Sequence, residues 1–161
     1  MTPPGANWRL PLCVAIGYLG HLVLSARLEA FGARPHIGLT VLAVACLFAG
    51  PNLAAFLGFG LGLLESWAVN QYVGSYLVSR SVAGFCVGAM DQRIFRDSVP
   101  MAVAAGAVTT LFADVLFFVF VPQPESIRWL TRTLGSALYD GGLAIPIYFA
   151  VRRVVHPVRP V

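Results

Sequence analysis

The segment from Ile37 to Val69 contains a single charged residue, Glu65. A membrane-spanning helix needs about 20 predominantly apolar residues, so this segment is too long for one untilted span. The sequence Gly-Pro-Asn at positions 50–52 interrupts it with strong turn chemistry. The segment therefore predicts two apolar helices, at residues 37–49 and 53–69.

The composition of the whole chain leads to the same class of protein. Hydrophobic residues make up 58% of the 161 residues, charged residues 11%, and the mean hydropathy is +0.77. A soluble domain carries about 25% charged residues, so the surface of this chain could not be hydrated on all sides. We therefore predict an all-α, polytopic integral membrane protein with one transmembrane domain over residues 1–161. The expected bundle has six transmembrane helices, at residues 10–28, 37–49, 53–69, 75–90, 99–121 and 129–151.

The distribution of arginine predicts the orientation of this bundle. The sequence has no lysine, so the net charge of +4 comes from arginine, which is expected to contact lipid headgroups rather than nucleic acid. Six spans place both termini on one side. Positive charge favours the cytoplasm, so we predict cytoplasmic termini. That side then holds six arginines and the other side four, namely Arg9, Arg93, Arg96, Arg152, Arg153 and Arg159 against Arg27, Arg34, Arg128 and Arg132.

Small residues recur at every fourth position in three of the predicted helices. Residues with this spacing form one smooth ridge along a helix, and inside a bilayer such ridges allow neighbouring helices to approach closely. The predicted packing ridges are Ala54, Gly58, Gly62 and Ser66 in the third helix, Gly84 and Gly88 in the fourth, and Ala102 and Gly106 in the fifth.

Two charged residues are expected to meet across the hairpin of the third and fourth helices. Glu65 lies seven residues before the turn near Tyr72, and Arg80 lies eight residues after it. Each therefore lies about 11 Å from the turn, at a rise of 1.5 Å per residue. A carboxylate and an arginine that meet in a low dielectric can both stay ionised as a pair. The pair could clamp the helix register, or it could contact a ligand or partner.

The same arithmetic places two aspartates at matching depth in the next hairpin. Asp114 and Asp140 are symmetric about Ile127 and fall in the same half of the membrane as the preceding pair. We expect the four ionisable groups to form an intramembrane polar cluster, or a small cavity open toward the outer face. Alternatively, the aspartates reach headgroups or water, and Gly141-Gly142 breaks the helix beside Asp140.

The sequence contains no motif that supports catalysis. It lacks a His-Glu-x-x-His zinc motif, a phosphate-binding glycine loop and a Gly-x-Ser-x-Gly elbow. Cys13, Cys46 and Cys86 lack metal-ligand spacing and are interpreted as small buried hydrophobes. His21 is interpreted as a hydrogen-bonded helix contact. We therefore expect no catalytic residue, metal or cofactor, and a protein that is not an enzyme.

Two stretches of the central hairpin resemble a known family. The run GFGLGLLES, followed by Gly74 and by VAGFCVGAMDQRIFR, is similar to the bacterial rod shape-determining protein MreD. The size, the number of spans and the ending IPIYFAVRRV also look like that family. The likeness is best over residues 51–96. Glu65 stands where the family usually has aspartate, and Arg80 is not associated with the family.

The resemblance implies a non-enzymatic subunit of the lateral cell-wall elongation machinery in the bacterial cytoplasmic membrane. Such a subunit would bind the single-pass protein MreC and, through it, connect MreB filaments with RodA and its transpeptidase. The exposed face of the fifth helix, at Phe117, Phe118 and Phe120, could meet the partner or only lipid.

Two other functions remain open. MreD resembles in fold the S components of energy-coupling-factor vitamin transporters, so the polar layer could instead bind a small solute. A proton-coupled carrier that uses Glu65, Asp114 and Asp140 is less favoured, since no inverted repeat is visible in the sequence.

Overall fold

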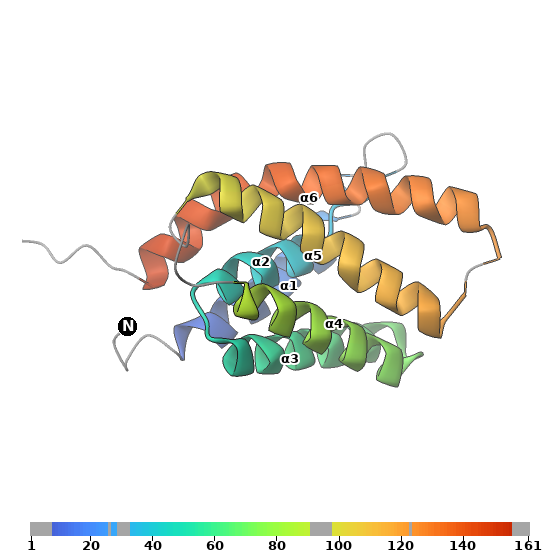
Figure 1. The fold of residues 1–161 in the computed structure, drawn as a ribbon, viewed down its shortest axis with the longest axis horizontal. Coiled ribbons are helices and arrows are strands. Elements are labelled where there is room, and N and C mark those ends of the chain that lie inside the picture. Colours follow the sequence, from blue (N-terminus) through green and yellow to red (C-terminus); the bar gives the residue numbers. More distant parts are fainter. Residues whose placement is uncertain (1–7, 26, 29–32, 91–97, 123, 156–161) are drawn as a thin grey trace, which may run out of the picture.

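The computed structural model of the chain describes residues 8–25, 27–28, 33–90, 98–122 and 124–155. The described residues are predominantly helical and include no strand. Figure 1 shows them as six helices: α1 (Arg9–Leu24), α2 (Ile37–Leu47), α3 (Pro51–Val69), α4 (Val73–Ala89), α5 (Val99–Phe120) and α6 (Ser126–Val155). The charged connection expected at residues 91–97, Glu29 and the tail arginine Arg159 lie outside the described residues.

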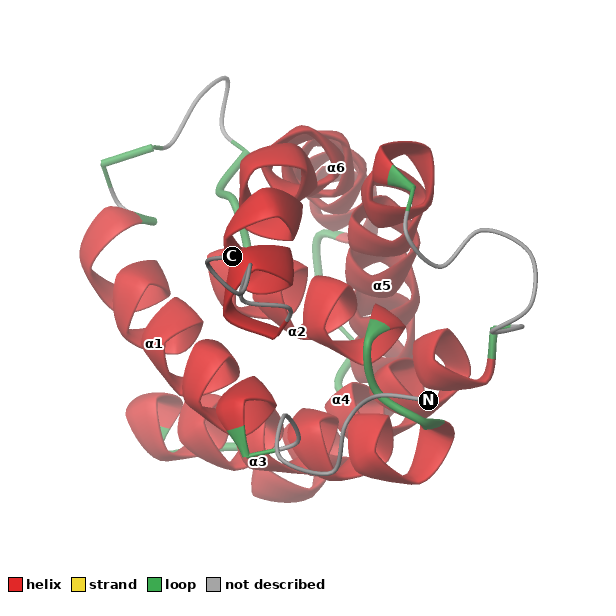
Figure 2. Ribbon diagram, turned by 90° about the vertical axis from the view of Figure 1, so that its left-hand side faces the viewer, coloured by secondary structure: helices red, strands yellow, loops and turns green. Residues whose placement is uncertain are grey.

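The shortest helix lies at the centre of the bundle. Every residue of α2 from Gly38 to Leu47 is buried, and the helix packs against each of the other five. Figure 2, which views the bundle end-on, shows α2 surrounded by its neighbours. A helix that is apolar all round has no face suited to water, and its sequence fits both a protein core and a lipid environment, so the packing of the other five helices decides that α2 is central.

Both ends of the described chain lie at the same end of the bundle. Arg9 Nη1 donates a hydrogen bond of 2.9 Å to the backbone carbonyl of Val154, which joins the start of α1 to the end of α6 (Figure 1). The opposite end of the bundle carries the end of α3, the start of α4, the end of α5 and the start of α6. The functional groups described below gather at that opposite end.

Glycine brings α3 and α4 into backbone contact. A Cβ atom added at Gly62 would lie 2.6 Å from the carbonyl oxygen of Tyr76, and one at Gly88 would lie 2.5 Å from Ala54 Cβ. Gly58 likewise abuts the carbonyl of Arg80, and Gly84 abuts the carbonyl of Ala54. Since these atoms belong mostly to the backbone, a side chain at either ridge would push the two helices apart.

A looser version of this arrangement joins α5 to α6. A Cβ atom added at Gly106 would lie 3.1 Å both from the carbonyl oxygen of Asp140 and from Ala144 Cβ. Ala102, one turn earlier, is completely buried. The contact is one of small residues, but it leaves more room than the interface of α3 and α4.

Several helix boundaries differ from the sequence-based prediction. α1 ends at Leu24 and not near residue 28, and the backbone N–H groups of Arg27 and Leu28 both donate to the carbonyl oxygen of Leu24 in a turn. α6 extends over 30 residues, from Ser126 to Val155, and neither Pro146 nor Gly141-Gly142 interrupts it. The alternative interpretation of Asp140, a helix break at Gly141-Gly142, is therefore wrong.

The turn between α3 and α4 is also shorter than predicted. Asn70 and Tyr72 adopt positive φ values of 54° and 55°, in the left-handed region. Asn tolerates this conformation, and it reverses the chain within three residues. α4 therefore starts at Val73, and Gly74 lies inside the helix, where a Cβ would meet no atom within 4 Å.

Three of the six helices are long and apolar enough to cross a membrane by themselves, namely α3, α5 and α6. α1 and α2 are apolar but have 16 and 11 residues. At 1.5 Å per residue, α2 is about 16 Å long, roughly half the thickness of a hydrocarbon core. The described part of the chain is thus all-helical, and three of its helices are long and apolar enough to span a membrane.

Candidate functional site

Glu65 on α3 and Arg80 on α4 form a buried ion pair. Arg80 Nε donates a hydrogen bond of 2.7 Å to Glu65 Oε2, and the exposed fractions of the two side chains are 4% and 10%. The glycines on both helices make this contact possible, since they bring the backbones close at the depth where the two side chains emerge. The structure thus brings together the two charges that the hairpin arithmetic pairs.

Asp114 on α5 lies on the other side of the same guanidinium group. Its Oδ1 atom is 3.8 Å from Arg80 Nη1, and its Oδ2 atom accepts a weak hydrogen bond of 3.5 Å from Thr133 Oγ1 on α6. Tyr76 and Phe117 face the guanidinium group, with Arg80 Cζ lying 5.3 Å and 6.0 Å from their ring centroids. Four helices therefore contribute to the environment of one arginine.

Asp140 has different partners from the other three ionisable residues. Its Oδ1 atom accepts the backbone N–H of His36 at 2.8 Å, and its Oδ2 atom accepts the Thr110 hydroxyl at 2.6 Å. The side chain is completely buried between α2, α5 and α6. Equal distance from a turn fixes the depth of a residue but not the direction in which it points. Asp140 therefore ties the start of α2 to the bundle.

A polar cavity of about 450 Å³ lies beside the ion pair. Residues from α4, α5 and α6, from the end of α1 and from the segment before α2 line it. Its charged members among the described residues are three arginines and one aspartate, namely Arg34, Arg80, Arg132 and Asp114. Glu65 lies behind this wall, paired with Arg80. The sequence predicted a polar layer here, but it assigned Arg34 and Arg132 only to the membrane surface.

Two histidines form another wall of the cavity. The rings of His21 and His36 are stacked with centroids 5.8 Å apart and an interplanar angle of 16°, and both line the cavity. His21 Nδ1 is buried and has no hydrogen-bond partner among the described residues. The pairing was missed in the sequence because His21 lies within α1 and His36 in the connection to α2, with no ligand-type spacing between them.

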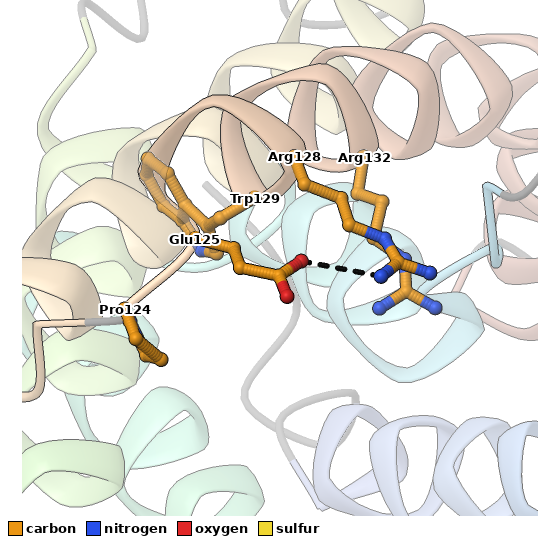
Figure 3. A pocket seen from close by; sticks show the side chains of 5 residues that line it. All are labelled: Pro124, Glu125, Arg128, Trp129 and Arg132. Atoms are coloured by element: carbon orange, nitrogen blue, oxygen red, sulfur yellow. Dashed lines mark hydrogen bonds and ion pairs between the residues drawn. The ribbon is translucent and has the colours of Figure 1, made fainter.

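A second, shallower cavity of about 280 Å³ adjoins the first at the start of α6 (Figure 3). Trp129 and Arg132 line both cavities. Figure 3 also shows the ion pair between Arg128 and Glu125, whose Nη1 and Oε2 atoms are 3.1 Å apart, with side chains 72% and 66% exposed. Arg128 and Arg132 thus both line the second cavity, one helical turn apart, and only Arg132 also lines the first.

The aromatic residues at the end of α5 do not form one exposed face. Phe117 lies against Arg80 and Tyr76, with its ring centroid 4.7 Å from that of Tyr76. Phe118 stacks on Trp129 at 4.3 Å. Phe120 is 52% exposed. Of the three phenylalanines considered for a partner or lipid surface, only Phe120 is predominantly exposed.

Within the described ranges, no group of three or more His, Cys, Asp or Glu side chains is placed to hold a metal ion. No protein-family model, curated protein or solved structure matches this chain. The class that the fold and the site define is a helical bundle with three helices long and apolar enough to span a membrane and with a polar cavity at one end.

Proposed function

We propose that this chain is a six-span, non-enzymatic subunit of the bacterial lateral cell-wall elongation machinery, similar to MreD. In this role it binds a single-pass, MreC-like membrane protein and helps to maintain rod shape. Through that partner it is connected with MreB, RodA and the transpeptidase.

The observation that carries this proposal is the position of the residues that resemble the family, in the interface between α3 and α4. Gly58, Gly62, Gly84 and Gly88 all lie in the interface of α3 and α4, where each replaces a side chain that would separate the helices. The buried pair of Glu65 and Arg80 crosses the same interface. The residues that resemble the family thus hold α3 and α4 together as one hairpin. A hairpin held in this way can present a fixed surface to a partner.

The proposed location is the bacterial cytoplasmic membrane, with both termini in the cytoplasm. The contact between Arg9 and Val154 supports termini on a common side. The arginine distribution favours the cytoplasm for that side. The polar cavity, at the other end of the bundle, would then open toward the outer face.

Affinity purification from the source cells tests this function. The tagged full chain, solubilised in a mild detergent, should co-purify one single-pass, MreC-like membrane protein. Deletion of the gene should convert rod-shaped cells into round ones. An equally tagged, unrelated six-span protein serves as the control. Rod-shaped cells after deletion, with no such partner in the eluate, would overturn the proposal.

The cavity of about 450 Å³ favours a second candidate, a solute-binding subunit similar to the S components of vitamin transporters. Pockets for small molecules commonly have volumes of about 300–1,000 Å³. A solute-binding subunit should be stabilised against heat by a vitamin-sized ligand, because a ligand that binds only the folded state raises its stability. The absence of such stabilisation across a panel of vitamins would remove this candidate.

A further inference from the structure

The charged side chains that line the larger cavity are predominantly basic. Arg34, Arg80 and Arg132 come from three different segments of the chain, and Asp114 is the one acidic residue that lines the cavity in the described part of the chain. Glu65, behind the wall, offsets one further positive charge. Three guanidinium groups from separate segments of the chain thus line one cavity. A partly buried basic cavity favours an anionic ligand.

The unsatisfied nitrogen of His21 is an independent indication of a ligand. A buried polar atom without a hydrogen-bond partner destabilises the folded state. His21 Nδ1 is such an atom, and the His21 ring lines the cavity together with that of His36. A ligand in the cavity could supply the missing partner, and so could an ordered water molecule. Titration with a ligand distinguishes the two.

The remaining polar lining consists of hydroxyl groups. Four hydroxyl-bearing residues face the cavity, namely Ser25, Tyr76, Thr133 and Ser136. A phosphate group has several acceptor oxygens and is well suited to a site that combines arginine, imidazole and hydroxyl donors. Arginine also matches the geometry of phosphate oxygens better than a point charge does.

We propose that this cavity binds a phosphate group, carried either by a small soluble compound or by the headgroup of an anionic lipid. The proposal does not depend on the scaffold function. It does not depend on the second candidate function either, because a phosphate group is not a requirement of a vitamin-binding subunit.

The first experiment titrates the purified full chain, in a non-ionic detergent, with inorganic phosphate. Sodium chloride and sodium acetate at equal ionic strength are the controls. Phosphate should raise the thermal unfolding midpoint in a saturable way, and the two control salts should not. An equal effect of all three salts would overturn the proposal for soluble phosphate.

Two arginines on the same helix provide a matched pair of variants. Arg132→Gln removes a charge that lines the cavity, whereas Arg128→Gln removes one a helical turn away, from an exposed ion pair. Arg132→Gln should weaken phosphate binding about tenfold, the effect of losing one charge-assisted contact. Arg128→Gln should leave the affinity unchanged. Equal effects of both variants would contradict a site in this cavity.

A third variant should strengthen binding and so cannot be mistaken for a folding defect. Asp114→Asn keeps the shape of the side chain but removes the negative charge from the cavity wall. Phosphate affinity should rise severalfold, because a like charge next to the anion is lost. Unchanged or weaker binding by a folded Asp114→Asn protein would contradict the proposal.

The lipid source is tested in nanodiscs of phosphatidylcholine with or without phosphatidylglycerol. Native mass spectrometry should detect phosphatidylglycerol retained by the wild type and by Arg128→Gln, and less of it on Arg132→Gln. If phosphatidylglycerol is retained but inorganic phosphate does not raise the unfolding midpoint, the site binds a lipid headgroup. If phosphate raises the midpoint but phosphatidylglycerol is not retained, the site binds a soluble compound. Failure of both arms overturns the proposal.

Discussion

Arg80 and Glu65 are hydrogen-bonded at 2.7 Å across the interface of α3 and α4, with side chains 4% and 10% exposed. Arg128 and Glu125 are 3.1 Å apart on the surface, with side chains 72% and 66% exposed. The two pairs have the same chemistry and similar lengths. Their energetic weight differs, because removal of one partner strands the other charge only where solvent cannot reach it.

Substitution of Arg80 by alanine should destabilise the bundle strongly. The change leaves Glu65 buried without its partner, and loss of one member of a buried pair costs about 3–5 kcal/mol. The measurement is the thermal unfolding midpoint of the purified protein in detergent. Arg128→Ala is the matched control and should change the midpoint little, because exposed pairs contribute little. Equal midpoints for Arg80→Ala and the wild type would show that the pair does not stabilise the fold.

The double variant Glu65→Gln/Arg80→Gln should be more stable than the two single variants predict by addition. Arg80→Gln leaves Glu65 buried without its partner, and Glu65→Gln leaves Arg80 with only the longer contact to Asp114. The double change instead leaves two neutral groups at this position that can still hydrogen-bond to each other. Additive shifts of the unfolding midpoint would indicate that the two side chains are not coupled.

Two glycines of α3 should respond in opposite ways to alanine. Gly58→Ala places a methyl group against the backbone carbonyl of Arg80, while Gly60→Ala places it in open space. We expect Gly58→Ala to cost about 1–3 kcal/mol through overpacking. Gly60→Ala should be neutral or slightly stabilising, since alanine favours a helix over glycine. Equal unfolding midpoints for the two variants would contradict the close approach of α3 and α4.

Substitution of Asp140 tests how the start of α2 is held. Asp140→Ala removes the acceptor for the backbone N–H of His36 and for the Thr110 hydroxyl. Two buried donors then lose their partner, so we expect a loss of about 2–4 kcal/mol. Asp140→Asn keeps one carbonyl oxygen for the His36 N–H and should cost clearly less. If both variants unfold at the same temperature, the hydrogen bond to α2 is not what Asp140 contributes.

Labelling of single cysteines tests the proposed six spans and their orientation. In a background without Cys13, Cys46 and Cys86, an impermeant maleimide should label Ala33→Cys, Gln71→Cys and Glu125→Cys on intact spheroplasts. Trp8→Cys and Arg153→Cys should react only after permeabilisation. If Ala33 and Trp8 react on the same side, α1 does not cross the membrane and the number of spans is lower than six.

The close contact of the α3–α4 hairpin could be derived from the sequence. Small residues at every fourth position and a turn near Tyr72 are local features, and a helix converts them into a face and a depth with little freedom. The positions of Glu65 and Arg80 follow from this arithmetic. The exact turn did not follow, since the left-handed conformations of Asn70 and Tyr72 carry no reliable sequence signal.

The partners of Asp140 could not be derived in the same way. Its depth is similar to that of Asp114, but its direction depends on how α6 is rotated against α2 and α5. That rotation is set by the packing of Gly106 against the α6 backbone and by the hydrogen bond from His36, which is 104 positions away in sequence. A pattern within one helix contains neither piece of information.

The sequence by itself determined the class of the protein, its helices and the helix faces that carry small residues, because these depend on composition and on a fixed helical repeat. Only the tertiary structure decided that α2 occupies the centre and that Arg34, Arg80 and Arg132 line one cavity with His21 and His36. The physical reason is that long-range packing selects which faces meet. Charges from distant segments therefore become neighbours only when all the helices are in place.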